Sequence, residues 1–144
     1  MSFRRLNSFQ LFISAISLGS IVSVAHAGEL VVLVENVKSD QGTVRAAIFN
    51  TAKNFTATPH ARQAVAAKIG TVSITFRNLQ TGQYAVAVFH DMNGNEKLDI
   101  NIAGMPVEPY GFSRDAIGLF GPPSFEEASF QVDGAAKAVN INLK

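Results

Sequence analysis

The strict alternation of apolar and polar side chains in residues 71–77 constrains the fold more than any other feature of this chain. Val72, Ile74 and Phe76 fall on one face, and the residues between them are polar. A period of two places successive side chains on opposite sides of an extended chain, so this segment predicts a half-buried β-strand. Residues 83–90 follow after a turn and are apolar on both faces, which is typical of a central strand. The chain therefore has the pattern of a β protein.

Further segments have the composition of short strands between turn signals. They are residues 30–37, 44–50, 126–132 and 138–143. Residues 54–68 fit either a helical turn or a poor strand, and the alternation of Val65, Ala67 and Ile69 favours the strand. About seven strands without an internal repeat predict an all-β fold, namely a seven-stranded antiparallel β-sandwich.

Residues 1–27 have the features of a secretory signal peptide. Arg4 and Arg5 are followed by an apolar stretch at residues 11–24, and residues 25–27 have the small-x-small pattern that signal peptidase accepts. The alternative is an uncleaved membrane anchor. We favour cleavage, because the stretch is shorter than the ~20 residues that a membrane-spanning helix needs.

The remaining residues, 28–144, contain no linker and are predicted to form a single domain. The absence of cysteine excludes disulfide scaffolds, thiolate nucleophiles, iron–sulfur clusters and cysteine zinc sites. A formal net charge of +1 offers no basic surface for a nucleic acid. We expect an exported bacterial domain, periplasmic or extracellular, with no nucleic-acid partner and no membrane span after signal cleavage.

Residues 104–123 contain four of the five prolines, so neither strand nor helix is expected to persist there. A loop of this length is uncommon in a compact domain and usually has a function. We expect its apolar side chains to pack it on the sandwich as one long ordered loop, at the same end as the loop after the central strand. These side chains are Met105, Val107, Tyr110, Phe112, Ile117, Leu119 and Phe120.

Residues 91–99 directly follow the expected central strand and have the spacing of a calcium loop. The oxygen-bearing side chains at positions 1, 3, 5 and 9 are those of Asp91, Asn93, Asn95 and Asp99. Side chains two residues apart on a curling loop can converge on one ion, and the backbone carbonyl of Lys97 would add a further oxygen. The sequence thus predicts calcium as a cofactor. With two carboxylates in the set, we expect weak binding, with a Kd of ~10⁻⁴–10⁻³ M.

The alternative for this segment is a metal-free hairpin. Asn93-Gly94 is a strong two-residue turn signal, and Asn and Asp cap turns without a metal. The segment also departs from an EF-hand, which has glycine at position 6 and a bidentate glutamate at position 12. Those positions hold Glu96 and Ile102 here, so the residues leave both interpretations open.

Four residues near this loop are candidate contacts for a ligand. His90 ends the expected central strand, where we favour a hydrogen-bonding role that orders the loop over a role as a catalytic base. Glu108, Tyr110 and Arg114 lie in the proline-rich segment, and loops on a rigid scaffold often carry function.

Two catalytic sets can be drawn from the sequence. One combines Ser113 and Asp115 with His90, but the chain has no G-x-S-x-G nucleophile elbow. The other pairs Glu108 with Glu126 or Glu127, as in a glycosidase. The two adjacent glutamates would face opposite sides of a strand, which favours a surface charge and a loop anchor over a catalytic pair. We assign no catalytic and no cofactor-binding residue.

The strings HDMNGNEKLD at 90–99, GMPVEPYGFS at 104–113 and FGPPSFEEASF at 120–130 resemble a bacterial family of small exported proteins known only as a domain of unknown function. The string LQTGQYAVAV at 79–88 is also similar to transthyretin-like and carboxypeptidase-regulatory-like sandwiches. The resemblance covers residues 28–144 and implies export and a prealbumin-type sandwich. It implies no activity. The residues that match the family pattern are His90, Asp91, Asn93, Asn95, Asp99, Pro106, Glu108, Pro109, Tyr110, Gly111 and Phe112.

We therefore expect a non-enzymatic binding or accessory module in which calcium orders one end for a cell-envelope or extracellular ligand. A second hypothesis is a small cell-envelope hydrolase that uses His90 and Glu108. A third is a structural domain with a metal-free hairpin, acting through an exposed sheet edge. A hydrolase would lose turnover in a His90→Ala variant, whereas a binding module would keep its affinity.

Overall fold

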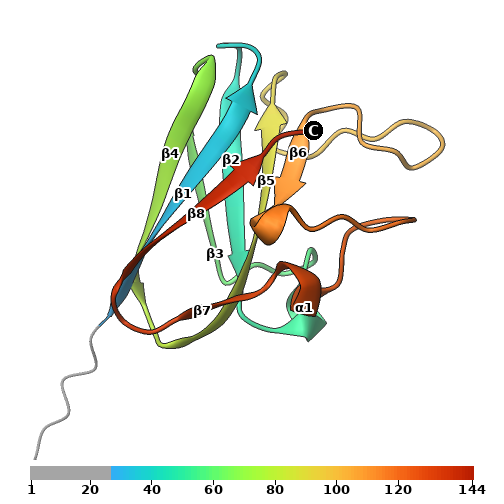
Figure 1. Ribbon diagram of the computed structural model, residues 1–144. Helices are drawn as coiled ribbons and strands as arrows, with labels where there is room; N and C mark the ends of the chain where they lie inside the picture. The colour runs from blue at the N-terminus through green and yellow to red at the C-terminus, as the bar shows by residue number, and fades with distance from the viewer. Residues whose placement is uncertain (1–26) are drawn as a thin grey trace, which may run out of the picture.

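Eight strands form two facing sheets in the computed structural model, which describes residues 27–144 (Figure 1). The elements are β1 (Gly28–Val37), β2 (Thr43–Phe49), η1 (Ala52–Asn54), β3 (Ala61–Ala66), β4 (Gly70–Leu79), β5 (Gly82–Asp91), β6 (Tyr110–Phe112), η2 (Ser113–Asp115), α1 (Phe125–Ala128), β7 (Phe130–Val132) and β8 (Ala136–Asn142). The predicted signal peptide lies outside the described residues except for its last position, so it stays a prediction.

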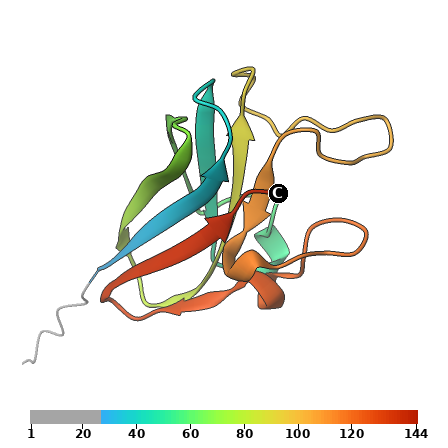
Figure 2. The same ribbon diagram turned by 45° about the horizontal axis from the view of Figure 1, so that its top comes forward.

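One sheet has the order β4-β1-β8, and the other has the order β3-β2-β5-β6, with β7 paired to the start of β5. Figure 2 shows how they face each other. The all-β sandwich of about seven strands is thus confirmed, with eight strands in the structure. One detail of the prediction was wrong, since β1 and β8 run parallel and not antiparallel, from Glu29↔Ala136 to Glu35↔Asn142. β8 enters its sheet after the chain has crossed over from the other one, so no tight hairpin imposes an antiparallel direction.

The core lies between the sheets and is filled by alternate side chains of each strand. The predicted alternation of residues 71–77 is confirmed in β4, where Val72, Ile74 and Phe76 are buried. The strand interpretation of residues 54–68 is confirmed for its second part, where β3 covers Ala61–Ala66. No helix in the described part of the chain is long and apolar enough to cross a membrane.

β5 is buried on both faces, as predicted for the central strand. On the face away from the core, its ladder partners include Phe49 and Phe112. Phe55 contacts both of these rings and that of Phe125, with ring centroids 5.3–5.9 Å apart. This aromatic cluster covers the second face, which explains why β5 lacks a polar side.

The strand expected at residues 126–132 was wrong in its first half. Ser124 accepts a hydrogen bond from the backbone N–H of Glu127, and the Glu127 carboxylate accepts one from the backbone N–H of Ser124. This capping box starts α1, and only β7 remains as a strand. Glu126 and Glu127 therefore lie in the first turn of a helix, not on opposite faces of a strand.

The proline-rich segment 104–123 also differs from the expectation. It contains β6, which pairs with β5, and η2. Gly111 allows β6 to lie close to β8, because a Cβ at this position would lie 2.7 Å from the backbone oxygen of Asn142. The expected packing of the apolar side chains was wrong for five of the seven. Met105, Val107, Ile117, Leu119 and Phe120 are exposed. Figure 1 shows the two loops on either side of β6 extending away from the sandwich.

Candidate functional site

A cluster of buried polar side chains lies where β5 ends and the chain enters residues 92–109. His90, Asp91 and Glu108 are all buried, and Arg45 of the neighbouring strand β2 reaches the same place. His90 points into the core between the sheets, as the alternating burial of β5 requires, and Asp91 points to the opposite face. His90 and Asp91, adjacent in β5, therefore make their contacts on opposite faces of the sheet.

Asp91 has no exposed surface and accepts hydrogen bonds on both carboxylate oxygens. Oδ2 accepts from Arg45 Nε at 2.7 Å and from the backbone N–H of Glu96 at 3.0 Å, while Oδ1 accepts from the backbone N–H of Gly94 at 2.7 Å. Burial by itself raises the pKa of Asp91, but the bonds from Arg45, Glu96 and Gly94 outweigh it and lower the pKa below its ordinary value. Asp91 is therefore an anion that holds the loop start to the sheet.

The Asp91–Asp99 loop curls through two successive turns closed by asparagine side chains. Asn93 Oδ1 accepts from the backbone N–H of Asn95, and Asn95 Oδ1 accepts from that of Lys97, at 3.1 and 2.9 Å. Both amide groups then donate to Asp99, Asn93 Nδ2 to Oδ2 at 2.6 Å and Asn95 Nδ2 to Oδ1 at 2.8 Å. The structure thus brings three of the predicted metal ligands into direct contact.

Glu108 closes this loop from the other side. Its Oε1 accepts from the backbone N–H of Met92 at 3.0 Å, and its Oε2 accepts from that of Asp99 at 3.1 Å. The carboxylate is buried in this position. Glu108 therefore joins both ends of the loop, a role that differs from the ligand contact or catalytic residue expected from the sequence.

His90 Nε2 lies 2.7 Å from the backbone oxygen of Gln41, in the turn between β1 and β2. The ring nitrogen donates this bond, because a carbonyl oxygen can only accept. Gly42 follows with a positive φ of 73°, and a Cβ there would lie 2.0 Å from the backbone oxygen of Asp91. The imidazole thus connects the β1–β2 turn to the end of β5.

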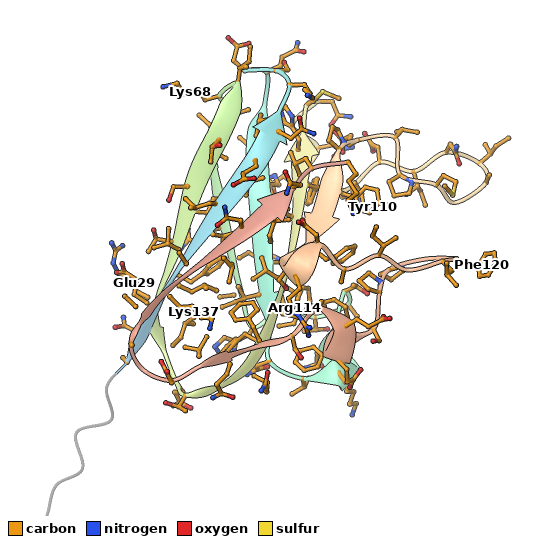
Figure 3. All side chains as sticks on the ribbon, viewed as in Figure 1. Glu29, Lys68, Tyr110, Arg114, Phe120 and Lys137 are labelled. Carbon is orange, nitrogen blue, oxygen red and sulfur yellow. The ribbon has the colours of Figure 1, made fainter. Side chains whose placement is uncertain are left out.

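Tyr110 and Arg114 are not brought together with Glu108 into one surface. Tyr110 is half-buried in β6, where its backbone pairs with Lys144 and its ring contacts Phe112. Arg114 is exposed in η2, and its Nη1 lies 3.4 Å from the backbone oxygens of Glu126 and Ser129. Figure 3 shows Tyr110 near the 92–109 connection and Arg114 near α1.

The two catalytic sets do not assemble. Ser113 is fully buried and its Oγ bonds the backbone of Val86 and Ala128. His90 lies four residues further along β5 than Val86, about 13 Å away at 3.3 Å per residue. Glu126 lies in α1, whereas Glu108 lies against the Asp91–Asp99 loop.

The carboxylate, amide and carbonyl oxygens of the Asp91–Asp99 loop are of the kind that a hard cation prefers, but two of its carboxylates already form ion pairs. Asp91 and Glu96 both pair with Arg45, at 2.7 and 3.0 Å. Asp99 has no ion pair with any lysine or arginine of residues 27–144. Thr43, the ladder partner of Asp91, has a buried hydroxyl oxygen without a hydrogen-bond partner within the same residues. Among residues 27–144, no three His, Asp or Glu side chains gather as metal ligands, so a cation would depend on amide and backbone oxygens.

Arg45 and the loop-closing role of Glu108 were not predicted from the sequence. A signal for Glu108 was present, since it belongs to the GMPVEPYGFS string that was singled out. Arg45 carried no such signal, because its contact depends on how β2 and β5 pair. The Asn93-Gly94 step does not close a two-residue hairpin: after Asp91, the next residue with a strand partner is Ile100, which bridges Pro106.

A family model described as "Uncharacterized protein conserved in bacteria (DUF2141)" matches residues 32–140, which is more than half of the chain. No curated protein and no solved structure matches the chain. The likeness to transthyretin-type sandwiches therefore stays a prediction.

Proposed function

The chain belongs to the bacterial DUF2141 family, whose description names no activity, and we propose that it is an exported, non-enzymatic binding module whose Asp91–Asp99 loop holds a calcium ion. The ion would order the end of the sandwich that presents this loop. A cell-envelope or extracellular ligand would then bind to the loops at this end, which a rigid β scaffold supports.

The environment of Asp99 carries the calcium proposal. Its carboxylate has no cationic partner among the described residues, and the side chains of Asn93 and Asn95 already meet it within hydrogen-bond distance. Carboxylate, amide and backbone carbonyl oxygens are the ligands that calcium prefers. Asn93, Asn95, Asp99 and the carbonyl of Lys97 would hold the ion, with Asp91 as the first ligand of the series.

The same contacts argue for weak binding. Arg45 already neutralises much of the charge on Asp91, so Asp99 is the main anion left for the ion. Affinity of calcium loops rises with the number of available carboxylates. We therefore expect a Kd of ~10⁻⁴–10⁻³ M, which suits a compartment with millimolar calcium.

The non-enzymatic part of the proposal rests on His90 and Glu108. A hydrolase would need one of them free to exchange a proton with a substrate. Instead, His90 is buried against Gln41, and both oxygens of Glu108 accept backbone hydrogen bonds. His90 is thus occupied in joining the β1–β2 turn to β5, and Glu108 in closing the Asp91–Asp99 loop.

Export is supported by the sequence of residues 1–27, with its basic pair, apolar stretch and small residues at the expected cleavage site. A bacterial envelope also suits a chain without cysteine. Determining the N-terminus of the protein recovered from the periplasm and the medium tests this part. A chain that starts at Gly28 supports it, and an uncleaved cytoplasmic chain contradicts it.

The calcium proposal is tested by following the melting temperature during calcium titration. At a concentration tenfold above Kd, we expect a rise on the order of 5 °C. Asp99→Asn should abolish the rise, while its backbone N–H can still bond Glu108. Asp40→Asn removes a charge from the exposed β1–β2 turn and should leave the rise unchanged. An equal shift in both variants, or none in the parent, would contradict calcium binding at this loop.

A further inference from the structure

Two loops beside β6 contain no charged residue. The first apolar loop comprises residues 100–107, and the second apolar loop comprises residues 116–124. Charged residues flank both of them, with Asp99 and Glu108 around the first and Asp115 and Glu126 near the second. Figures 1 and 2 show both loops extending from the same side of the sandwich.

The tips of these loops expose large apolar side chains to solvent almost completely. Ile102 is 110% exposed, Leu119 91% and Phe120 104%. Figure 3 shows Phe120 at the outer tip of its loop, away from the sandwich. Four more apolar side chains in these loops are at least 58% exposed: Ile100, Met105, Val107 and Ile117. Single exposed apolar residues are common, but seven on two neighbouring loops mark an interaction site.

The first apolar loop also satisfies much of its own backbone. Asn101 Oδ1 accepts from the backbone N–H groups of Ala103 and Met105, and the backbone N–H of Asn101 bonds the oxygen of Met105. Gly104 donates to the backbone oxygen of Asn101. When a loop moves from water into an apolar environment, each backbone N–H or C=O group without a hydrogen-bond partner carries a large desolvation cost. This loop can enter an apolar environment without that cost for these groups.

We propose that the two apolar loops insert their tips into the interfacial region of a lipid bilayer. The tips are separate and protruding, so together they form two projections and not a flat face or a groove. A bilayer accommodates such projections, whereas a protein partner would need two matching apolar pockets. The lack of charge on both loops also favours lipid, because no charged group has to be desolvated on insertion.

This binding would be driven by apolar area and not by charge. We therefore expect it on neutral phosphatidylcholine vesicles, with little effect of salt, because no lysine or arginine lies on either loop. It also does not rest on calcium in the neighbouring Asp91–Asp99 loop. A chelator should leave it unchanged, so failure of the calcium proposal and failure of this one are separate results.

The test is cosedimentation with phosphatidylcholine vesicles, comparing variants that share one N-terminus so that any contribution of residues 1–27 cancels. Ile102→Ser should lower the partition coefficient about tenfold, because it removes a large apolar side chain from the tip of the first apolar loop. Leu119→Ser/Phe120→Ser should lower it further. Ile69→Ser is the matched control, because Ile69 is 64% exposed beside Lys68, at the turn between β3 and β4 and away from both loops (Figure 3).

A fluorescent reporter gives an independent readout, because the chain contains no tryptophan. Phe120→Trp should show a blue shift with vesicles and quenching by brominated lipid, whereas Ile69→Trp should show neither. Absence of parent binding to neutral vesicles would overturn the proposal, as would equal binding of the loop variants. Binding only to anionic vesicles that is lost in 0.5 M salt would also overturn it, as would a parent dimer that the loop variants convert to monomers.

Discussion

Arg45 and Asp91 lie diagonally opposite each other on β2 and β5, with Nε of Arg45 2.7 Å from Oδ2 of Asp91. Asp91 has no exposed surface, whereas the Arg45 side chain keeps 23% of its own. The carboxylate therefore depends on the guanidinium, because water cannot replace it. This pair fixes the point from which the Asp91–Asp99 loop departs.

Replacing Arg45 with methionine should lower the free energy of unfolding by about 3 kcal/mol, because it leaves a buried carboxylate without its cation. Urea denaturation measures this change. Arg77→Met is the matched control, since Arg77 pairs with Glu29 at 2.9 Å on the exposed side of the sandwich. An exposed pair contributes less than ~1 kcal/mol, so equal losses in the two variants would contradict the special role of Arg45.

The stability of the parent should decrease with acid in a way that depends on Asp91. Its pKa is lower in the folded chain than the ordinary 3.8, so its contribution is present above about pH 4 and is lost as the pH falls through the folded-state pKa. Asp91→Asn lacks this titration. Urea midpoints between about pH 6 and pH 2 should therefore show the largest gap between parent and variant at the upper end. A constant gap would rule out this linkage.

Glu108→Gln should loosen the Asp91–Asp99 loop. The amide has one acceptor oxygen where the carboxylate has two, so the backbone N–H of Met92 or of Asp99 loses its partner. We expect a loss of about 2 kcal/mol in stability and faster hydrogen exchange at the amide that loses its partner. Glu126→Gln, on an exposed helix turn, should change neither. Unchanged exchange in Glu108→Gln would contradict the loop-closing role.

Ser113→Ala tests the structural role of this serine. Its Oγ accepts from the backbone N–H of Val86 at 2.9 Å, directly after the β5–β6 ladder ends at Phe112. Removing the hydroxyl leaves that buried N–H unpaired, so we expect a loss of about 2 kcal/mol in the free energy of unfolding. Ser73→Ala on the exposed face of β4 should cost less than ~0.5 kcal/mol. Equal costs would show that the Ser113 hydroxyl contributes nothing special.

The strands were predictable where their pattern is local. Alternation in residues 71–77 and the two-sided apolar run at 83–90 identified β4 and β5 directly. The parallel pairing of β1 and β8 was not predictable, because it depends on the path that the chain takes between the sheets. The helix α1 was predictable in principle. Its Ser124-x-x-Glu127 capping box is local, but β-favouring residues after it dominated the interpretation.

The candidate site was likewise predictable only where its contacts are local in sequence. The close spacing of Asn93, Asn95 and Asp99 favoured contact between their side chains, since turns of residues two apart curl the chain and the contacts with Asp99 span only four and six residues. The roles of Arg45 and Glu108 depend on contacts 46 and 16 residues apart along the chain. Such contacts follow from strand register and from the return of the chain at β6, which no local pattern encodes.

β1 is the middle strand of its sheet, and its partner β8 is synthesised more than 100 residues later, as the hydrogen bond from Asn36 to Leu143 across 107 residues illustrates. Until residues 136–142 have emerged, one edge of the apolar strand around residues 30–34 has no partner. Contacts this distant in sequence close slowly, so the sandwich can complete its folding only after β8 has been synthesised. A chain truncated before Ala136 would keep that apolar edge unpaired and would be a template for aggregation.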